Sequence, residues 1–196
     1  MSRARPFCPF PRRPDCQTRR ESCRPGLQTR REFAARWVKE AAEGDHYRLA
    51  FDQAGTWSQK YNLVWDRLLG LNLFPPDVAQ TEMAFYRRSQ QACGLPLDSR
   101  RLYTKLDWIT WTATLTGRRE DFVALIDPIY TFLNTTPHRV PMTDWYWTHD
   151  ATKVGFQARP VVGGVFLRLL YERDVWKKWA GREKVKASNW APLPLQ

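Results

Sequence analysis

The segment 122–133 constrains the fold most, because its apolar side chains follow one helical period. These side chains recur at spacings of three and four residues: Phe122, Leu125, Ile126, Ile129, Tyr130 and Leu133. Such spacing puts them on one face of an α-helix, whereas a strand would alternate them between two faces. Pro128 lies inside the segment and is expected to kink the helix.

Helical periodicity recurs along the chain, so an all-α fold is expected. A second apolar face predicts a helix over 58–69, capped by Thr56 or Ser58, and consists of Trp57, Tyr61, Val64, Trp65 and Leu68. The remaining helices are expected near 33–43, 76–90, 105–116, 157–172 and 173–186. Gly44 is expected to end the helix near 33–43. The apolar stripe of the helix near 157–172 consists of Val162, Val165, Phe166, Leu169 and Leu170. The long connection 135–156 is predicted to lack regular structure and to serve function.

Residues 1–31 form a basic segment without helical periodicity. Nine arginines against Asp15 and Glu21 give this segment a net charge of +7, out of +11 for the chain. Its proline and arginine content predicts disorder. Because most of the charge lies in a tail, no nucleic-acid partner is expected. The predicted organisation is a disordered tail at 1–31, a helical domain at 32–186 and a loose C-terminal segment at 187–196.

Neither a metal site nor a cofactor site is expected from the sequence. The histidines and the cysteines of the tail lie at spacings that match no zinc motif: His46, His138 and His149, and Cys8, Cys16 and Cys23. Cys93 stands alone in the body of the chain, and no Gly-rich phosphate loop occurs. The chain has no apolar run of about 18 residues, so no membrane partner is expected. No apolar core of a secretory signal is visible at its N-terminus.

Polar and aromatic clusters lie at the starts of alternate predicted helices. They cover 56–61, 98–107 and 155–159, and the connection at 144–146 adds another. If successive helices are antiparallel, these helix starts share one face of the domain, and helix N-termini attract polar ligands. The sequence therefore predicts a site on that face. The alternative is ordinary capping, since Ser, Thr and Asp are common at helix starts anyway.

Five long segments of the sequence resemble one known family. They are GTWSQKYNLVWDRLLGLNLFP, GLPLDSRRLYTKLDWITWTATL, DFVALIDPIYTF, TPHRVPMTDWY and VGFQARPVVGGVF. In this order they resemble the C-terminal part of the glutaminase A family of fungi and bacteria, over about residues 31–171. The resemblance implies a six-helical-hairpin (α/α) toroid, hydrolysis of L-glutamine to L-glutamate and ammonia, and an extracellular location.

A full ring of six hairpins needs about twelve helices, and this chain offers six or seven. The expected fold is therefore a partial (α/α) toroid, with the missing N-terminal half of the toroid as a possible partner. Two alternatives to a glutaminase remain open at this point. One is a carbohydrate-active toroid hydrolase, because fold alone does not decide chemistry. The other is a non-catalytic partial toroid with exposed apolar faces.

Hydrolysis of glutamine requires a cation for the α-carboxylate, an anion for the α-ammonium, and a base or nucleophile at the amide. Arginine binds carboxylates bidentately, and lysines such as Lys60 and Lys105 stabilise developing negative charge. The catalytic candidates are Asp107 and Asp144. The substrate-binding candidates are Trp57, Lys60, Tyr61, Arg100, Trp108, Trp145 and Arg159. For each charged residue the competing interpretation is a structural salt bridge.

Overall fold

The computed structural model describes residues 16–180 of the chain. Helices dominate the elements, in which η marks a 3₁₀ helix: α1 (Cys16–Ala41), β1 (Ala42–Glu43), β2 (His46–Tyr47), η1 (Tyr61–Leu63), α2 (Val64–Leu68), α3 (Pro76–Ser89), β3 (Tyr103–Lys105), α4 (Leu106–Ala113), α5 (Arg119–Thr135), β4 (Trp145–Trp147), η2 (Pro160–Phe166), α6 (Leu167–Tyr171) and α7 (Arg173–Ala180). The strands are only two or three residues long. The prediction of an all-α fold is therefore confirmed.

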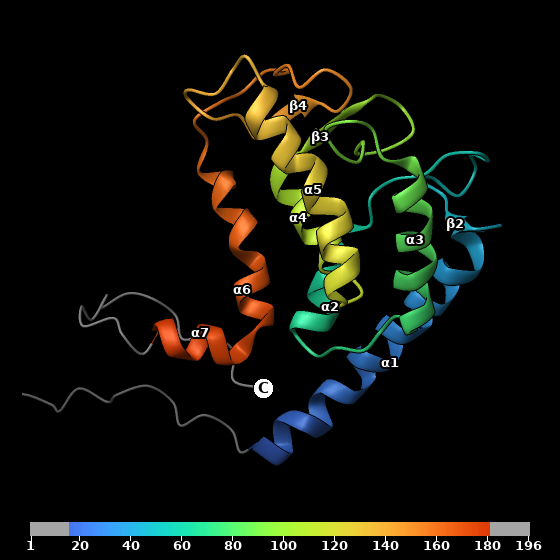
Figure 1. Ribbon diagram of the computed structural model, residues 1–196. Helices are drawn as coiled ribbons and strands as arrows, with labels where there is room; N and C mark the ends of the chain where they lie inside the picture. The colour runs from blue at the N-terminus through green and yellow to red at the C-terminus, as the bar shows by residue number, and fades with distance from the viewer. Residues whose placement is uncertain (1–15, 181–196) are drawn as a thin grey trace, which may run out of the picture.

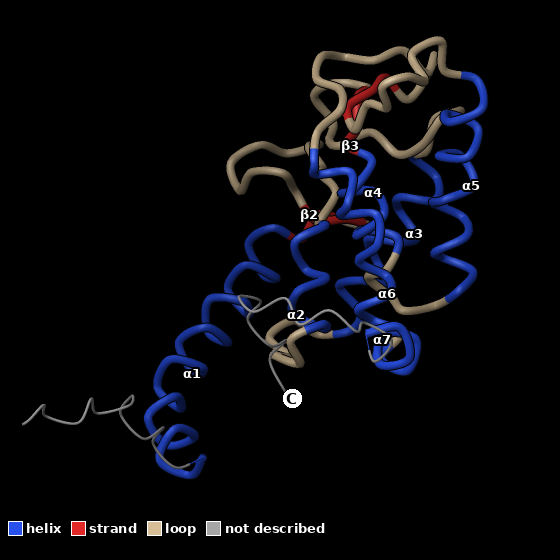
Figure 2. The backbone as a smooth tube through the Cα atoms, turned by 90° about the vertical axis from the view of Figure 1, so that its left-hand side faces the viewer, coloured by secondary structure: helices blue, strands red, loops and turns tan. Residues whose placement is uncertain are grey.

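Helix α1 begins well before the predicted boundary at residue 32. The structure places residues 16–31 in the helix, so the prediction of disorder was wrong for that stretch. Residues 1–15 and 181–196 lie outside the described part of the chain, which leaves out the predicted C-terminal segment and the end of the helix predicted over 173–186. Side-chain pairs four residues apart support the helix, with Gln28 bonded to Glu32 and Arg36 to Glu40. Both views show the N-terminal half of α1 extending away from the other helices (Figures 1 and 2).

The predicted helix over 58–69 is shorter than expected. Only 61–68 is helical, as η1 followed by α2, and neither helix has a side-chain cap. Gln59 explains the difference, because its buried amide donates to Leu95 O, Pro96 O and Thr104 Oγ1 at 3.0–3.1 Å. Tertiary hydrogen bonds thus hold this stretch extended, and the proposed caps at Thr56 and Ser58 are not used.

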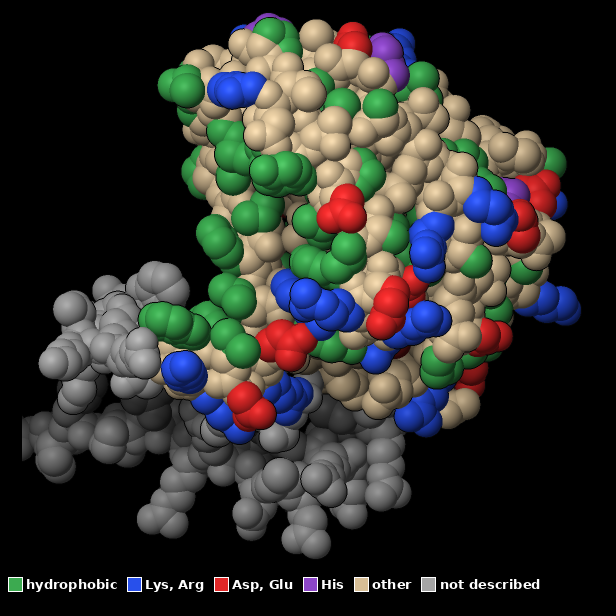
Figure 3. All heavy atoms as spheres, in the orientation of Figure 1, with side chains coloured by type: hydrophobic (Ala, Val, Ile, Leu, Met, Phe, Trp, Pro, Cys, Tyr) green, Lys and Arg blue, Asp and Glu red, His purple; other side chains and the backbone are tan. Residues whose placement is uncertain are grey.

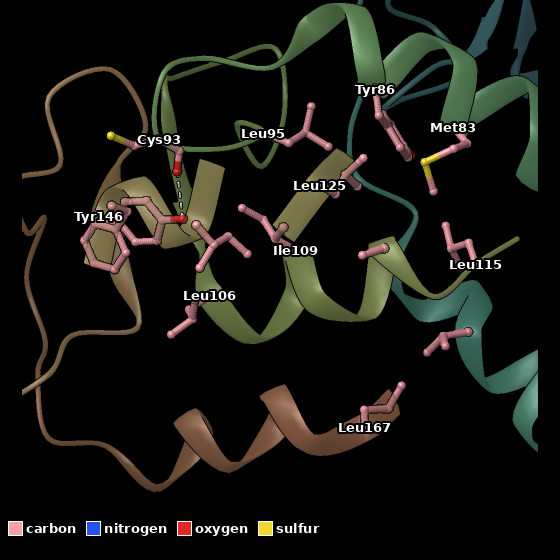
Figure 4. Close-up of a cluster of buried hydrophobic side chains, with 14 of the residues drawn as sticks. Met83, Tyr86, Cys93, Leu95, Leu106, Ile109, Leu115, Leu125, Tyr146 and Leu167 are labelled. Carbon is pink, nitrogen blue, oxygen red and sulfur yellow. Dashed lines mark hydrogen bonds between the residues drawn. The ribbon is translucent and has the colours of Figure 1, made fainter. Parts of the chain in front are cut away.

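Helices α4 and α5 pack together at the centre of the molecule, between α3 and α6 (Figure 1). Figure 4 shows the core around them, where Leu106, Ile109, Leu125 and Tyr146 converge. Helix α5 continues through Pro128 and buries Leu125, Ile129 and Phe132. The predicted stripe was partly wrong: Tyr130, a member of it, is 69 % exposed.

The connection 135–156 contains regular structure, contrary to the prediction. Strand β4 pairs antiparallel with β3, and the register places Lys105 opposite Trp145. Tyr146, in the centre of β4, is fully buried and donates from its hydroxyl to Cys93 O at 3.1 Å. Alternation explains this pattern, because Tyr146 faces the core while Trp145 and Trp147 are half-buried.

The predicted sixth helix consists of η2 and α6. Of this stretch only Leu167 is fully buried, whereas Phe166 of the predicted stripe is 64 % exposed. Hydrophobic side chains accordingly line the α6 side of the surface in Figure 3. No helix within residues 16–180 is long and apolar enough to cross a lipid bilayer.

Candidate functional site

The junction of β3 and α4 is the centre of the candidate site. Lys105 is the last residue of β3 and precedes the first turn of α4. The strand register puts Trp145 beside it, and the N–H of Leu106 donates to Asp144 O at 2.8 Å. Two segments that are about forty positions apart in the sequence therefore meet at this junction.

Asp144 holds two cations at the junction. Its side chain is fully buried, and it accepts a bidentate pair from Arg159 Nε and Nη2 at 3.0 and 2.5 Å, as well as a hydrogen bond from Lys105 Nζ. Burial raises the pKa of Asp144, but the hydrogen bonds from Arg159 and Lys105 outweigh burial and lower it below the ordinary aspartate value. Asp144 therefore stays ionised and orients both cations.

Asp107 lies in the first turn of α4 and is only 5 % exposed. Within the described part of the chain, its Oδ1 is buried without a hydrogen-bond partner. Burial raises the pKa of Asp107, and the charge of Asp144 adds to this, while nearby backbone N–H groups and Lys105 oppose it. A buried carboxyl oxygen without a partner, beside two cations, is the kind of group that takes part in proton transfer.

Arg159 precedes η2, which packs directly on α4. Trp111 Nε1 donates to Gly164 O at 2.8 Å, and a Cβ at Gly164 would lie 2.9 Å from Asp107 Cβ. Glycine at this position therefore allows η2 to approach α4 closely. The guanidinium of Arg159 also lies 4.9 Å from the centre of the Phe156 ring. These contacts fix the position of Arg159 relative to Asp107.

Aromatic rings surround the ion cluster. The Lys105 ammonium lies 5.5 Å from the centre of the Trp145 ring and 5.9 Å from that of Trp108. Trp108 in turn stacks on Tyr61, with ring centres 4.3 Å apart. The indole Nε1 of Trp145 is buried and has no hydrogen-bond partner among the described residues. The rings shield the charges from water and so strengthen their interactions.

A pocket of about 580 Å³ adjoins this aromatic wall, and Tyr61 and Trp108 belong to its lining. It is lined by Trp37, Leu49, Ser58, Gln59, Lys60, Tyr61, Asn62, Leu63, Phe74, Leu97, Asp98, Arg100 and Trp108. Arg100 is mostly exposed at its edge and pairs with Asp98 at 2.6 Å. The pocket combines aromatic and polar groups, as small-molecule sites do.

The structure brings most of the predicted site residues together. The ion cluster and its walls contain Asp107, Asp144, Tyr61, Trp108, Trp145 and Arg159, while Lys60 and Arg100 line the adjoining pocket. The predicted convergence of the segments 98–107, 144–146 and 155–159 is confirmed by the contacts of Asp144.

Trp57 is the predicted residue that the structure places elsewhere. It packs against Phe85 and Tyr86 of α3, with ring centres 5.3 and 6.4 Å away. The sequence analysis in turn missed Trp111 and Gly164. Two signals were available for them, since Trp111 lies one helical turn after Asp107 and Gly164 belongs to a glycine pair that follows Arg159.

No group of His, Cys, Asp and Glu within residues 16–180 has the arrangement of a metal site. The acids described above are instead bonded to Lys and Arg or lie alone.

Comparison with known proteins identifies the family. A model of the glutaminase A six-helical-hairpin domain matches residues 19–169. Glutaminase A from Aspergillus oryzae is 36 % identical over 149 residues, which cover 71 % of this chain and 21 % of that protein. A probable glutaminase from Arthroderma benhamiae is 31 % identical over 164 residues, which cover 67 % of this chain and 19 % of that protein. No solved structure matches the chain. The matched part of this chain spans about a fifth of the length of the two curated relatives. Because the family model matches most of its residues, the chain belongs to the glutaminase A six-helical-hairpin family.

Proposed function

We propose that the cluster around Asp107 hydrolyses the side-chain amide of L-glutamine to L-glutamate and ammonia. The observation that carries this proposal is the buried Oδ1 of Asp107, which has no partner among the described residues and lies in a group with a raised pKa. The names of the two relatives support the same reaction. The cations support the substrate class, because Lys105 and Arg159 lie together at the site, where a guanidinium suits the carboxylate of a substrate.

Each group has a distinct role in the proposed reaction. The ionised carboxylate of Asp107 takes a proton from the water that attacks the amide carbon, and the resulting carboxyl gives a proton to the departing ammonia. Lys105 stabilises the negative charge that develops on the amide oxygen. Arg159 holds the α-carboxylate of the substrate, and Asp144 keeps both cations in position. Trp108 and Trp145 form the walls that exclude bulk water.

The carbohydrate-active alternative requires two available carboxyl groups that flank a glycosidic bond. Asp144 does not fit that role, because Arg159 and Lys105 occupy both of its oxygens. Among the described residues of the cluster, Asp107 alone offers a carboxyl oxygen without a partner, and a single available carboxyl suits amide hydrolysis better. Release of ammonia from L-glutamine distinguishes the proposal from the non-catalytic alternative, because a non-catalytic chain would release none.

The test is release of ammonia from L-glutamine by the purified 196-residue chain, with circular dichroism on the same sample. We expect Asp107→Asn to lower turnover about 100-fold, the contribution typical of a general acid–base. Asp52→Asn provides the matched control, since Asp52 lies exposed in a turn before Gly55 and should leave turnover unchanged.

A helical chain that releases no ammonia from L-glutamine would contradict the proposal for this chain and favour the non-catalytic alternative. The corresponding Asp→Asn substitution in the Aspergillus oryzae relative then tests the residue separately. Unchanged turnover in that variant would remove Asp107 from the reaction.

A further inference from the structure

The amine of Lys60 is surrounded by three oxygens on the edge of the pocket beside the Tyr61–Trp108 stack. Its Nζ lies 3.0 Å from Tyr47 O, 3.0 Å from Arg48 O and 2.9 Å from Ser58 Oγ. Both Lys60 and Ser58 line the pocket of about 580 Å³. The role predicted for Lys60, stabilising negative charge on a substrate, does not account for these contacts.

Hydrogen-bonding capacity determines what the three contacts mean. A charged lysine has three N–H donors, whereas the neutral amine has two donors and one lone pair. The carbonyls of Tyr47 and Arg48 can only accept hydrogen bonds. The charged amine donates one hydrogen bond to each of the three oxygens, Ser58 Oγ included. When Lys60 loses a proton, its two remaining N–H groups serve the two carbonyls, and its lone pair faces the Ser58 hydroxyl. That arrangement is the one in which an amine accepts a proton from a serine.

The surroundings of Lys60 make it easier for the amine to lose a proton. Burial lowers the pKa of Lys60, and the charge of Glu82 in α3 opposes this in part. Glu82 is itself fully buried, and burial raises its pKa although Lys60 acts in the opposite direction. Other titratable groups nearby are the phenol of Tyr86, His46 beside Glu82, and Asp98 in the pocket. Desolvation thus shifts Lys60 and Glu82 together towards their uncharged forms.

Tyr86 holds the serine and the lysine in a fixed geometry. Its hydroxyl accepts from Lys60 N at 2.9 Å and donates to Ser58 O at 3.0 Å. Tyr86 is fully buried in α3, and burial keeps the pKa of its phenol well above the ordinary value. The backbone on both sides of Gln59 is therefore clamped to a rigid helix, which restricts how far Ser58 and Lys60 move apart.

We propose that Ser58 and Lys60 form a nucleophile–base pair that accepts acyl groups from small amides or esters bound in this pocket. A serine activated by an adjacent amine is a known solution to acyl transfer. This inference goes beyond the proposed function, in which Asp107 activates water directly and no covalent intermediate forms.

The step balances as an ordinary acyl transfer. Ser58 Oγ forms a bond to the acyl carbon, and its proton passes to Lys60 Nζ. The bond from that carbon to the amine or alcohol breaks, and the ammonium of Lys60 returns the proton to the departing group. Water then hydrolyses the ester on Ser58, with Lys60 again as the base, which restores both side chains. The sum consumes one water molecule and yields one acid and one amine or alcohol.

A fluorophosphonate provides the test, because it phosphonylates activated serines with loss of fluoride and requires no glutamine turnover. We expect the 196-residue chain to carry one adduct, on Ser58, when its peptides are analysed by mass spectrometry. Ser58→Ala should lose it. Lys60→Arg should slow labelling about 100-fold, since arginine retains the charge but does not act as a base at these pH values.

Ser99 provides the matched control. It follows Asp98, which pairs with Ser58 across the backbone, and it is more exposed than Ser58. Its Oγ accepts from Trp57 N at 3.2 Å, and no hydrogen bond to a lysine is found for it among the described residues. Ser99→Ala should label like the wild-type chain. Circular dichroism on each variant shows whether it is folded.

The pH dependence of labelling in the wild-type chain keeps the proposal testable even if Lys60→Arg does not fold. The labelling rate should rise with pH as Lys60 loses its proton, and it should level off before the pH reaches about 10.4, the ordinary pKa of lysine. A rate that keeps rising with hydroxide concentration beyond that pH would overturn the proposal. So would a folded chain in which Ser58 remains unlabelled or reacts no faster than Ser99.

Discussion

Asp144 illustrates how one buried carboxylate can organise a site. Replacing it by Asn leaves the ammonium of Lys105, which is 12 % exposed at its side chain, without its anion. Loss of one partner from a buried ion pair costs about 3 kcal/mol, because the other charge stays desolvated. We expect Asp144→Asn to lower the free energy of unfolding by that amount at pH 7, measured by urea denaturation.

The control for this prediction is Glu120→Gln, which removes an exposed ion pair with Arg118. Exposed pairs contribute little, so stability should not change. The effect of Asp144→Asn should also depend on pH. The folded-state pKa of Asp144 is lowered, so its stabilisation is complete above the unfolded value of about 3.9 and is lost as pH falls through the folded value. An equal loss at pH 3 and pH 7 would contradict this account.

Asp107 should show the opposite dependence on pH. Its folded-state pKa is raised by burial, so the folded chain holds this proton more tightly than the unfolded chain does. The contribution of Asp107 to the free energy of unfolding is therefore greatest below its unfolded-state pKa of about 3.9, and it declines as the pH rises through its folded-state pKa. We expect Asp107→Asn to stabilise the chain by about 1 kcal/mol at pH 7, while lowering turnover. Destabilisation at pH 7 by this isosteric change would contradict the assigned environment.

At the scale of elements, contact between η2 and α4 determines the geometry of the site. A methyl group at Gly164 would lie 2.9 Å from Asp107 Cβ and 3.3 Å from Trp111 Nε1. We expect Gly164→Ala to push η2 away from α4, to cost about 2 kcal/mol of stability, and to lower turnover by displacing Arg159. Gly163→Ala is the control, because nothing lies within 4 Å of its added Cβ. Equal stability of the two variants would refute the close contact.

The sequence predicted some elements well and others poorly, for physical reasons. Helix α3 matches its prediction closely, since Pro75 and Pro76 fix its start and the local pattern is complete. The stretch 58–60 failed because Gln59 bonds to Leu95 O and other groups far away in the sequence. Local periodicity carries no information about such partners. For the same reason the sequence did not predict β4, since its three residues pair with β3, which lies about forty positions earlier.

The sequence pattern predicted which segments meet around the candidate site, but not how the side chains in those segments are bonded. Antiparallel helices and polar helix starts were enough to bring 98–107, 144–146 and 155–159 together. Sequence could not show that Asp144 is saturated by two cations while Asp107 Oδ1 has no partner in the described structure. These distinctions depend on side-chain direction, which a pattern of residue types does not determine.

At the scale of the whole molecule, apolar side chains remain exposed along one side of the helical body. The surface residues of η2, α6 and α7 include Val161, Phe166, Leu169, Val175, Trp176 and Trp179, and hydrophobic side chains gather on this side in Figure 3. We call this set the η2–α7 face. Single exposed apolar residues are ordinary, whereas a contiguous group of them favours contact with another apolar surface.

The η2–α7 face should make the chain bind a hydrophobic dye and self-associate as its concentration rises. Phe166→Ser removes the most exposed ring of this face, which is 64 % exposed, and is expected to weaken both effects. Because that side chain is not part of the buried core, stability should change little. Dye fluorescence and sedimentation velocity over a concentration series measure the two effects. Val140→Ser is the matched control, since Val140 is 92 % exposed but lies in the connection before β4. If both variants bind dye and associate like the wild-type chain, the η2–α7 face does not act as one binding surface, and its exposed apolar residues are separate from one another.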